Sequence, residues 1–332
     1  MNLPRRLAFR SSALLAAGAL ALSGCGALSD DSASADDGIQ VVAAFYPLQY
    51  VAERVAGDLA DVENLTQPGG EPHDLELTPR ETGAIVDADL VVFETGFQPT
   101  VDDSVEANAT GEVVDVADVV ELLKTEEHED EHADDEHAEE EAGHEGEEEG
   151  HADEEGHEHG DVDPHFWQDP LRMADLGDAV AEKLGELDAG NADEYTANAA
   201  DLRSDLEELD ESYRSTLTSC ERSTVVVSHD AFSYLTKYGL DMEPINGLSP
   251  DAEPTPADRA RLEDLIREDG ITTVFSERLA TKRLANAVAE DAGVTTAVLD
   301  PIEGLSDETA DDDYLSLMNA NLEALVKANG CQ

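Results

Sequence analysis

Short apolar runs alternate along this chain with longer segments in which apolar residues recur every three or four positions. The short runs, rich in valine, isoleucine and phenylalanine, predict buried β-strands, and the longer spacing predicts amphipathic helices. The predicted strands are residues 39–45, 62–65, 90–93, 113–116, 224–227, 272–275 and 295–299. The predicted shorter helices are residues 48–59, 171–187, 232–238, 259–268, 281–292 and 314–327. Strands that alternate with helices predict an α/β fold with mostly parallel sheets flanked by helices.

One predicted helix, residues 191–217, is much longer than the others. Its apolar positions, spaced by three and four, are Tyr195, Ala199, Leu202, Leu206, Leu209, Tyr213 and Leu217. At about 1.5 Å per residue it would be roughly 40 Å long, which is enough to run along two lobes. We therefore expect an N-terminal lobe (39–188), a linking helix (189–219) and a C-terminal lobe (220–332). Ligands of such folds bind outside the C-terminal ends of the strands.

The N-terminal lobe is interrupted by an acidic segment, residues 125–161. It carries 20 acidic side chains and seven histidines in 37 positions, without Lys or Arg. Because it has only a few alanines to bury, we expect it to be a disordered loop inserted into the lobe. Its histidines are His128, His132, His137, His144, His151, His157 and His159.

The start of the chain has the pattern of an export signal. Three arginines precede the apolar residues 13–22, a stretch too short to span a bilayer as a helix. The sequence Leu-Ser-Gly-Cys that ends at Cys25 resembles the bacterial lipobox, whose cysteine receives the lipid anchor; the alternative is an ordinary signal peptide with a chance cysteine. We expect residues 1–24 to be the signal peptide and 25–38 a flexible tether, which places the protein outside the cytoplasm, on the outer face of the cell membrane or in the periplasm.

The net charge of −60 is extreme. It argues against binding to nucleic acid, because the phosphate backbone would repel the protein. It equally disfavours adhesion to anionic lipid headgroups. Such acidity suits the attraction of cations, or solubility in a saline habitat, and composition does not separate these explanations.

Two cysteines remain after Cys25, namely Cys220 and Cys331. An even pair in an oxidising compartment predicts a disulfide, which would tie the C-terminal end to the start of the second lobe. The alternative is two free thiols.

Three of the ten histidines lie outside the acidic segment, and each falls in a predicted loop. His73 follows a Gly-Gly-Glu-Pro turn, His165 lies just after the acidic segment, and His229 directly follows a predicted strand, as Asp300 does. Three imidazoles and one carboxylate can complete a tetrahedral Zn²⁺ site, whereas Mn²⁺ favours more oxygen ligands. The spacing is long-range, so a solvated His73 and a purely turn-forming Asp300 remain the alternatives at this point.

Four segments around these residues resemble the ligand segments of the zinc/manganese-specific substrate-binding proteins of bacterial ABC importers, in that family's order. They are Gly-Gly-Glu-Pro-His-Asp at 69–74, Asp-Pro-His-Phe-Trp-Gln-Asp-Pro at 163–170, Val-Ser-His-Asp-Ala-Phe at 227–232 and Leu-Asp-Pro at 299–301. The long helix and Phe-Ser-Glu at 275–277 match as well, so the resemblance covers nearly all of residues 39–327.

The resemblance implies two α/β lobes, joined by one rigid helix, with a metal ion between them. It makes His73 and His165 ligands from the first lobe, and His229 and Asp300 ligands from the second. Manganese members carry a carboxylate in place of His229, so this residue indicates zinc. Some zinc members have a glutamate directly before the first histidine, where this chain has Pro72, so the fourth ligand would be Asp300 or water.

What the resemblance implies about function is a binding protein and not an enzyme. The chain would be a monomeric lipoprotein that passes Zn²⁺ to the permease and ATPase of an importer. Glu277 would orient a ligand, or be a solvated loop acid. The histidines of the acidic segment, a feature of the zinc branch, would capture zinc weakly for transfer, or have no required role. A manganese importer component, an exported zinc hydrolase that uses a metal-bound water, and an adhesin or zinc buffer are the alternatives.

Overall fold

The computed structural model describes residues 38–125, 162–250 and 254–332. The expected signal peptide and lipidation site Cys25, nearly all of the expected tether and the seven histidines of the acidic segment lie outside the described residues. Among the described residues, no helix is both long and apolar enough to cross a bilayer.

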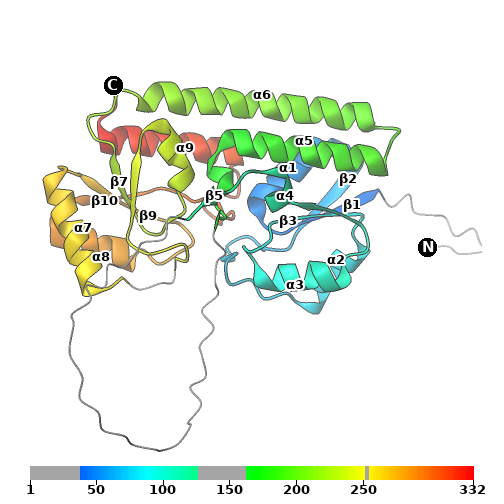
Figure 1. Cartoon of the computed structure of the whole chain (residues 1–332), viewed down its shortest axis with the longest axis horizontal. Helices are drawn as coiled ribbons and strands as arrows, with labels where there is room; N and C mark the ends of the chain where they lie inside the picture. The colour runs from blue at the N-terminus through cyan, green and yellow to red at the C-terminus, as the bar shows by residue number, and fades with distance from the viewer. Residues whose placement is uncertain (1–37, 126–161, 251–253) are drawn as a thin grey trace, which may run out of the picture. The chain divides into compact units, whose positions relative to one another are not determined.

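The first half of the chain forms a parallel four-stranded sheet in the order β2-β1-β3-β4, and we call the part built on it the N-terminal lobe. The strands are β1 (Ile39–Ala43), β2 (Ala60–Asn64), β3 (Leu90–Phe93) and β4 (Glu112–Asp115). The helical elements are α1 (Tyr46–Ala56), η1 (Gly57–Leu59), α2 (Pro79–Asp87), α3 (Pro99–Asn108), α4 (Val116–Val119), η2 (Phe166–Gln168) and α5 (Pro170–Leu187). Helices α1 and α5 lie on one side of the sheet and α2 and α3 on the other (Figure 1). The two central strands β1 and β3 are buried because both faces of the sheet are covered.

The second half forms another parallel sheet, in the order β10-β9-β7-β8, and we call this part the C-terminal lobe. Its strands are β7 (Thr224–Val227), β8 (Asp241–Pro244), β9 (Thr273–Ser276) and β10 (Thr295–Val298), and its helices are η3 (Ser233–Tyr238), α7 (Pro256–Glu268), α8 (Arg283–Ala292) and α9 (Tyr314–Asn329). Val226 and Val274 pack with the apolar residues of α7 and α8, whereas Val225 and Val227 join the main core. Alternate side chains of a strand point to opposite faces, so this sheet is also covered on both sides.

Helix α6 (Ala192–Leu217) joins the two lobes, as its length predicted. It runs along α5 of the first lobe and α9 of the second (Figure 1). Its buried residues include Tyr195, Leu202 and Leu206, and Tyr213 donates a hydrogen bond to the carbonyl of Met318 in α9 over 2.6 Å. A disulfide between Cys220 and Cys331, as expected, ties the segment after α6 to the segment after α9.

The expected fold class is confirmed, whereas several local elements differ from expectation. Helices α2 and α3 were not anticipated, because their apolar residues are few; α2 begins instead with a capping box between Thr78 and Glu81. The strand β8 was missed because its sequence, Asp-Met-Glu-Pro, is half polar and contains a proline. The helix expected at 232–238 is a 3₁₀ helix.

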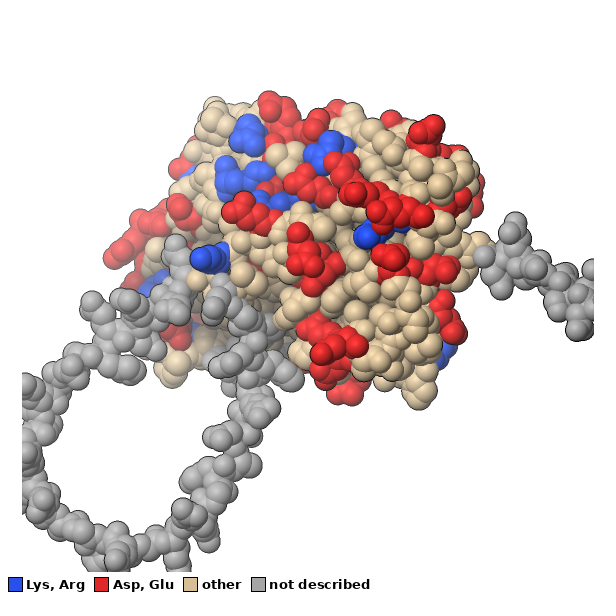
Figure 2. All heavy atoms as spheres, turned by 45° about the vertical axis from the view of Figure 1, so that its right-hand side comes forward, with Lys and Arg blue, Asp and Glu red and all other residues tan. Residues whose placement is uncertain are grey.

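The face of the molecule drawn in Figure 2 carries more acidic than basic side chains, in keeping with the net charge of −60.

Candidate metal centre

Three histidines and one glutamate meet between the two lobes. His73 comes from the loop between β2 and α2, His165 precedes η2, His229 follows β7, and Glu303 lies in the loop after β10. One ligand atom from each lies within 4.8 Å of those of the other three. His165 and His229 are fully buried, Glu303 is 1% exposed and His73 is 9% exposed. Two loops of each lobe therefore contribute to one site.

The spacing of these atoms matches a four-coordinate metal ion. One oxygen of Glu303, Oε1, lies 3.4 Å from His73 Nε2, 3.6 Å from His165 Nε2 and 3.3 Å from His229 Nε2. A tetrahedron with Zn–N bonds of about 2.0–2.1 Å has edges of about 3.3–3.4 Å. Among the described residues, the buried Nε2 atoms of His165 and His229 have no hydrogen-bond partner. The donor atoms are therefore spaced for a central ion and too far apart for good hydrogen bonds to one another.

Buried carboxylates orient two of the imidazoles through contacts with their Nδ1 atoms. His165 Nδ1 lies 2.8 Å from Asp163 Oδ1, and His229 Nδ1 lies 2.6 Å from Glu277 Oε1. A carboxylate at Nδ1 selects the tautomer with a proton there, which directs the Nε2 lone pair toward the ion. Glu277 is 3% exposed and also accepts a hydrogen bond from the Ser228 hydroxyl. The structure therefore places Glu277 behind a ligand and not in a solvated loop.

Asp300, which the sequence led us to expect as the fourth ligand, is not among the four clustered groups. Its Oδ1 accepts a hydrogen bond from the backbone N–H of Ile302 over 2.9 Å, and its Oδ2 pairs with Arg278 Nε at 2.8 Å. Its backbone is held by Asn321 of α9 through two hydrogen bonds. Asp300 shapes the loop after β10, and the expectation that it binds the metal is corrected in favour of Glu303.

The conformation of this loop accounts for the position of Glu303, and not Asp300, beside the three histidines. Ile302 has a φ of 61°, in the left-handed region that a β-branched residue rarely adopts. The chain turns there, and the carbonyl of the preceding Pro301 accepts hydrogen bonds from Trp167 Nε1 at 2.7 Å and Gln168 Nε2 at 2.5 Å. Strain of this kind is stored where the surrounding structure over-determines a functional geometry. Here it accompanies a turn that directs Glu303 inward.

The charges of the site are strongly coupled in the metal-free protein. Burial works to lower the pKa of His229, but the carboxylates of Glu277 and Glu303 outweigh it and raise this pKa to about 10. Burial alone would raise the pKa of Glu303, yet its contacts with the three histidines hold it well below the ordinary value. Burial together with the charge of Glu303 raises the pKa of nearby Glu71 to about 8. The metal-free site thus holds protons that an incoming cation must displace.

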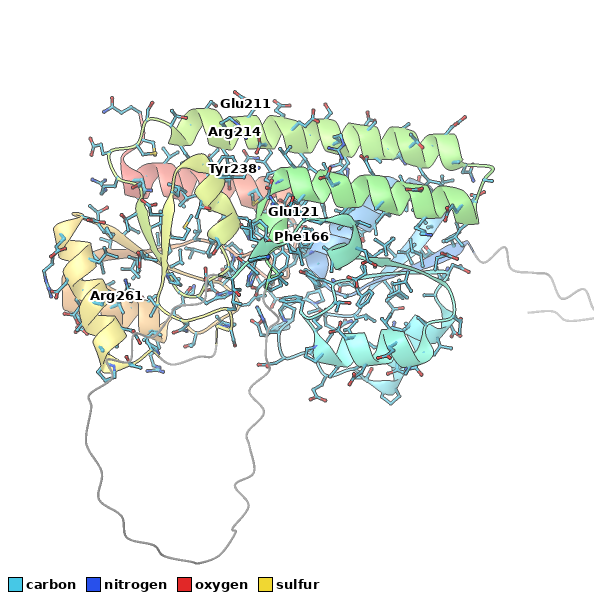
Figure 3. All side chains as sticks on the ribbon, in the orientation of Figure 1. Glu121, Phe166, Glu211, Arg214, Tyr238 and Arg261 are labelled. Atoms are coloured by element: carbon cyan, nitrogen blue, oxygen red, sulfur yellow. A yellow bond between two sulfur atoms is a disulfide. The ribbon has the colours of Figure 1, made fainter. Side chains whose placement is uncertain are left out.

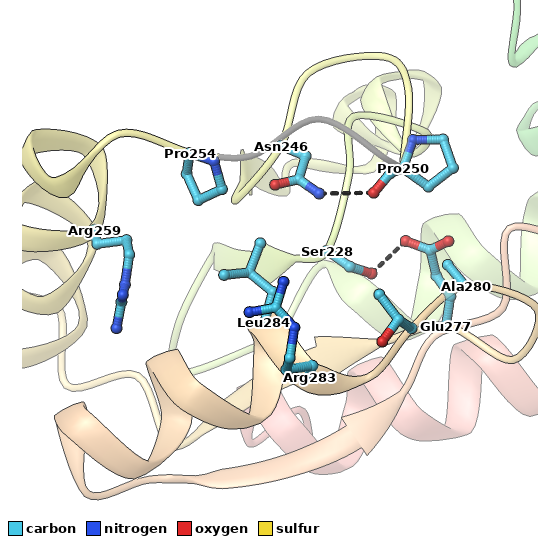
Figure 4. A pocket seen from close by; sticks show the side chains of 10 residues that line it. Ser228, Asn246, Pro250, Pro254, Arg259, Glu277, Ala280, Arg283 and Leu284 are labelled. Atoms are coloured by element: carbon cyan, nitrogen blue, oxygen red, sulfur yellow. Dashed lines mark hydrogen bonds between the residues drawn. The ribbon is translucent and has the colours of Figure 1, made fainter.

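Glu277 and Ser228 also line a partly open pocket of about 280 Å³ in the C-terminal lobe (Figure 4). Its other walls include Asn246 and, from α8, Arg283 and Leu284. The three histidines and Glu303 do not line it. Glu277 therefore contacts a metal-ligand candidate, His229, and also lines a separate pocket.

Sequence reasoning singled out three of the four clustered groups and missed Glu303 and Asp163. Glu303 is separated from Asp300 by only two residues, so the loop offers two carboxylates, and the sequence contains no criterion to choose between them. Asp163 stands two residues before His165 in the segment that carried the family resemblance, so a search for carboxylates beside ligand histidines would have found it.

Comparisons with known proteins find zinc-binding relatives. The family profile described as ZnuA, zinc-uptake complex component A, periplasmic, matches residues 41–328. The zinc-binding lipoprotein AdcA of Streptococcus pneumoniae strain R6 is 34% identical over 298 residues, which cover 88% of this chain and 56% of AdcA. The high-affinity zinc uptake system protein ZnuA of Bacillus subtilis is 34% identical over 319 residues, which cover 94% of this chain and 95% of that protein. The chain thus spans about half the length of AdcA and nearly the whole of the Bacillus protein.

Solved structures show the same fold. The Zn(II)-bound ZnuA-like domain of Streptococcus pneumoniae AdcA superposes with a TM-score of 0.69 at 29% identity, covering 88% of this chain and 99% of that one. The laminin-binding protein Lmb of Streptococcus agalactiae, described as a bifunctional protein with adhesin and metal-transporting activity, gives 0.72 at 28% identity, covering 88% and 99%. A matching family profile over most of the chain, supported by relatives above 30% identity, shows that this protein belongs to the ZnuA family of zinc-uptake substrate-binding proteins.

Proposed function

We propose that the protein binds one Zn²⁺ ion between its lobes and delivers it to a membrane ABC importer. The observation that carries the proposal is the arrangement of three Nε2 atoms around Glu303 Oε1 at 3.3–3.6 Å. Three imidazoles and one carboxylate form a donor set that suits zinc, whereas manganese favours octahedral coordination by oxygen. The family supplies transport components and not enzymes. Four protein ligands also leave no open position for a catalytic water.

The partners and location follow from the same family membership. A binding protein of this kind would be recognised by a permease that works with an ATPase, with the chain acting as a monomer. Relatives are named as lipoproteins, which supports anchoring through Cys25 outside the cytoplasm. Two acyl chains would suffice for stable attachment.

A zinc titration of the purified chain, followed by a competing chelator, tests metal binding. We expect one tightly bound Zn²⁺ per chain, at least about 100-fold weaker binding of Mn²⁺, and loss of the tight site in His229→Ala. Equal or stronger binding of Mn²⁺ would favour the alternative that the protein is a component of a manganese importer. A deletion strain that grows as well as its parent under zinc limitation would exclude delivery to an importer even if the protein binds zinc.

We also infer a capture role for the seven histidines of residues 125–161. The described residues that flank this segment form the antiparallel pair β5 (Leu123–Lys124) and β6 (Val162–Asp163), and His165 follows β6 by two residues. Because Lys124 pairs with Val162, residues 125–161 can be replaced by Asn-Gly, which closes a two-residue hairpin. We expect this variant to keep its tight zinc site and to import zinc more slowly when zinc is scarce. Unchanged uptake in zinc-depleted medium would show that the segment is dispensable.

A further inference from the structure

The helix η3 connects the lobes directly behind the metal centre. Tyr234 in η3 donates a hydrogen bond from its hydroxyl to the carbonyl of Asp163 over 2.7 Å and accepts one from the N–H of Leu123 at 2.9 Å. Three residues later, Lys237 Nζ lies 2.6 Å from Asp169 Oδ1. Both partners, Asp163 and Asp169, belong to the N-terminal lobe, whereas η3 belongs to the C-terminal lobe.

These contacts are shielded from water. Tyr234 is 1% exposed, Asp163 3% and Asp169 2%, and the Lys237 side chain is 24% exposed. A polar contact between buried groups is costly to break, because each partner is left without the hydrogen bonds that water would supply. The contacts therefore resist separation of the lobes at this point.

Helix α6 anchors η3 as well. Lys237 Nζ also lies 2.7 Å from Asp210 Oδ1 of α6, and the neighbouring Tyr238 hydroxyl donates to the same oxygen over 2.7 Å. Arg214, one turn further along α6, pairs with Asp210 Oδ2 at 2.9 Å. Figure 3 shows Tyr238 and Arg214 close together beside α6. Lys237 thus joins the first lobe, the second lobe and the linking helix.

The contacts that Tyr234 and Lys237 make lie on either side of one metal ligand in the chain and close to another. His165 lies between Asp163 and Asp169 in the chain, so η3 holds the segment that carries it at both ends. The helix η3 itself begins four residues after His229, and the N–H of Ala231 donates to the carbonyl of His229 over 3.0 Å. The imidazoles of His165 and His229, which come from different lobes, lie with their ring centres 5.4 Å apart.

We propose that Tyr234 and Lys237 are positioning residues that fix His165 against His229 and thereby restrict the site to a small, four-coordinate ion. The proposal rests on the proposed zinc function and extends it to metal selectivity. A larger ion that prefers six oxygen ligands can be accommodated only if the ligand segments move apart to admit water. Holding the two segments together before any metal arrives disfavours that expansion.

Competitive titration of Zn²⁺ and Mn²⁺ into Tyr234→Phe, Lys237→Met and the double variant tests this. Tyr213→Phe is the matched control, because it also removes one buried hydroxyl hydrogen bond, to Met318. The ring of Tyr213 packs against Tyr238 of η3 and is kept in this variant, whereas the hydroxyl that is removed bonds only to α9. Loss of one buried hydrogen bond corresponds to roughly a fivefold change in an equilibrium constant. We expect the ratio of zinc to manganese affinity to fall about fivefold in Tyr234→Phe and at least tenfold in the double variant, and to stay within twofold in Tyr213→Phe.

A merely structural role would lower thermal stability without changing the ratio of zinc to manganese affinity. The thermal stability of the metal-free and metal-loaded protein is therefore measured alongside that ratio. An unchanged ratio in the folded Tyr234→Phe and double variants, or an equal drop in Tyr213→Phe, overturns the proposal. If Lys237→Met does not fold, Tyr234→Phe alone decides. Failure of the wild-type chain to prefer zinc would instead contradict the proposed function, so the two failures are distinguishable.

Discussion

Glu303→Gln replaces one carboxylate oxygen by an NH₂ group, so a charged carboxylate becomes a neutral amide of nearly the same size. The substitution removes the negative charge that lies 3.3–3.6 Å from all three histidine Nε2 atoms, and leaves the histidines themselves in place. It therefore separates the contribution of the fourth ligand from that of the fold. Asp300→Asn is the matched control, because it makes the same chemical change three positions away in the same loop.

The structure sets the size of the expected effects. Removing a carboxylate that only orients a ligand costs about 10–100-fold in metal affinity, so loss of a direct ligand should cost more than about 100-fold, or roughly 2.7 kcal/mol. Asp300 instead bonds Ile302 N–H and Arg278, so Asp300→Asn should change zinc affinity by less than about threefold and reduce the free energy of unfolding by roughly 1 kcal/mol.

Zinc affinity is measured by competition with a chelator of known affinity, together with the thermal unfolding of each metal-free variant. The unfolding curve of the metal-free protein shows whether a weak site reflects a lost ligand or a damaged loop. If Asp300→Asn weakens zinc binding more than 100-fold while Glu303→Gln binds like the wild type, the assignment of Glu303 is refuted.

A substitution of Glu277, a change of pH and removal of the disulfide test the same site and the stability of the fold. Glu277→Gln should weaken zinc binding about 10–100-fold, because His229 loses the carboxylate that orients it; an affinity equal to that of the wild type in the same chelator competition would contradict this role. The pKa of His229 is raised to about 10, because Glu277 and Glu303 outweigh the opposing effect of burial, so the metal-free residue is protonated at neutral pH and zinc must displace that proton. The apparent affinity for zinc should therefore rise about tenfold per pH unit between pH 6 and 8 and fall on acidification. Calorimetry in buffers of different ionisation enthalpy should detect about one proton released from His229. Zinc binding that does not depend on pH would exclude the displacement of this proton. Replacing Cys220 and Cys331 by serine opens a loop of 111 residues, which should reduce the free energy of unfolding by up to about 4–5 kcal/mol while one zinc still binds; unchanged denaturation would show that the link is dispensable.

Local sequence was sufficient to predict the central strands, the buried face of the long helix and the ligand His229, because each depends on the pattern of nearby residues. The short valine-rich runs form central strands of the two sheets, such as β3 and β7, because a strand buried on both faces needs continuous apolar residues. The three-to-four spacing through Leu202, Leu206 and Tyr213 appears as the buried face of α6. His229 was identifiable because it follows such a strand directly, at the end where ligands of parallel sheets bind. The paired cysteines and the three histidines outside the acidic segment were evident from counting alone.

Only the tertiary structure decided between Asp300 and Glu303. Both carboxylates follow β10, and their chemistry is nearly the same. The left-handed conformation of Ile302 accompanies the inward turn of Glu303, and the Pro301 carbonyl beside it is held by Trp167 and Gln168, which lie more than 130 residues earlier in the sequence. The side chain of Asp300 is paired with Arg278 from the loop after β9, and its backbone is bonded to Asn321 of α9. The direction of a side chain in a loop depends on contacts from distant parts of the chain, so the identity of the fourth ligand is a property of the assembled lobes and not of the local sequence.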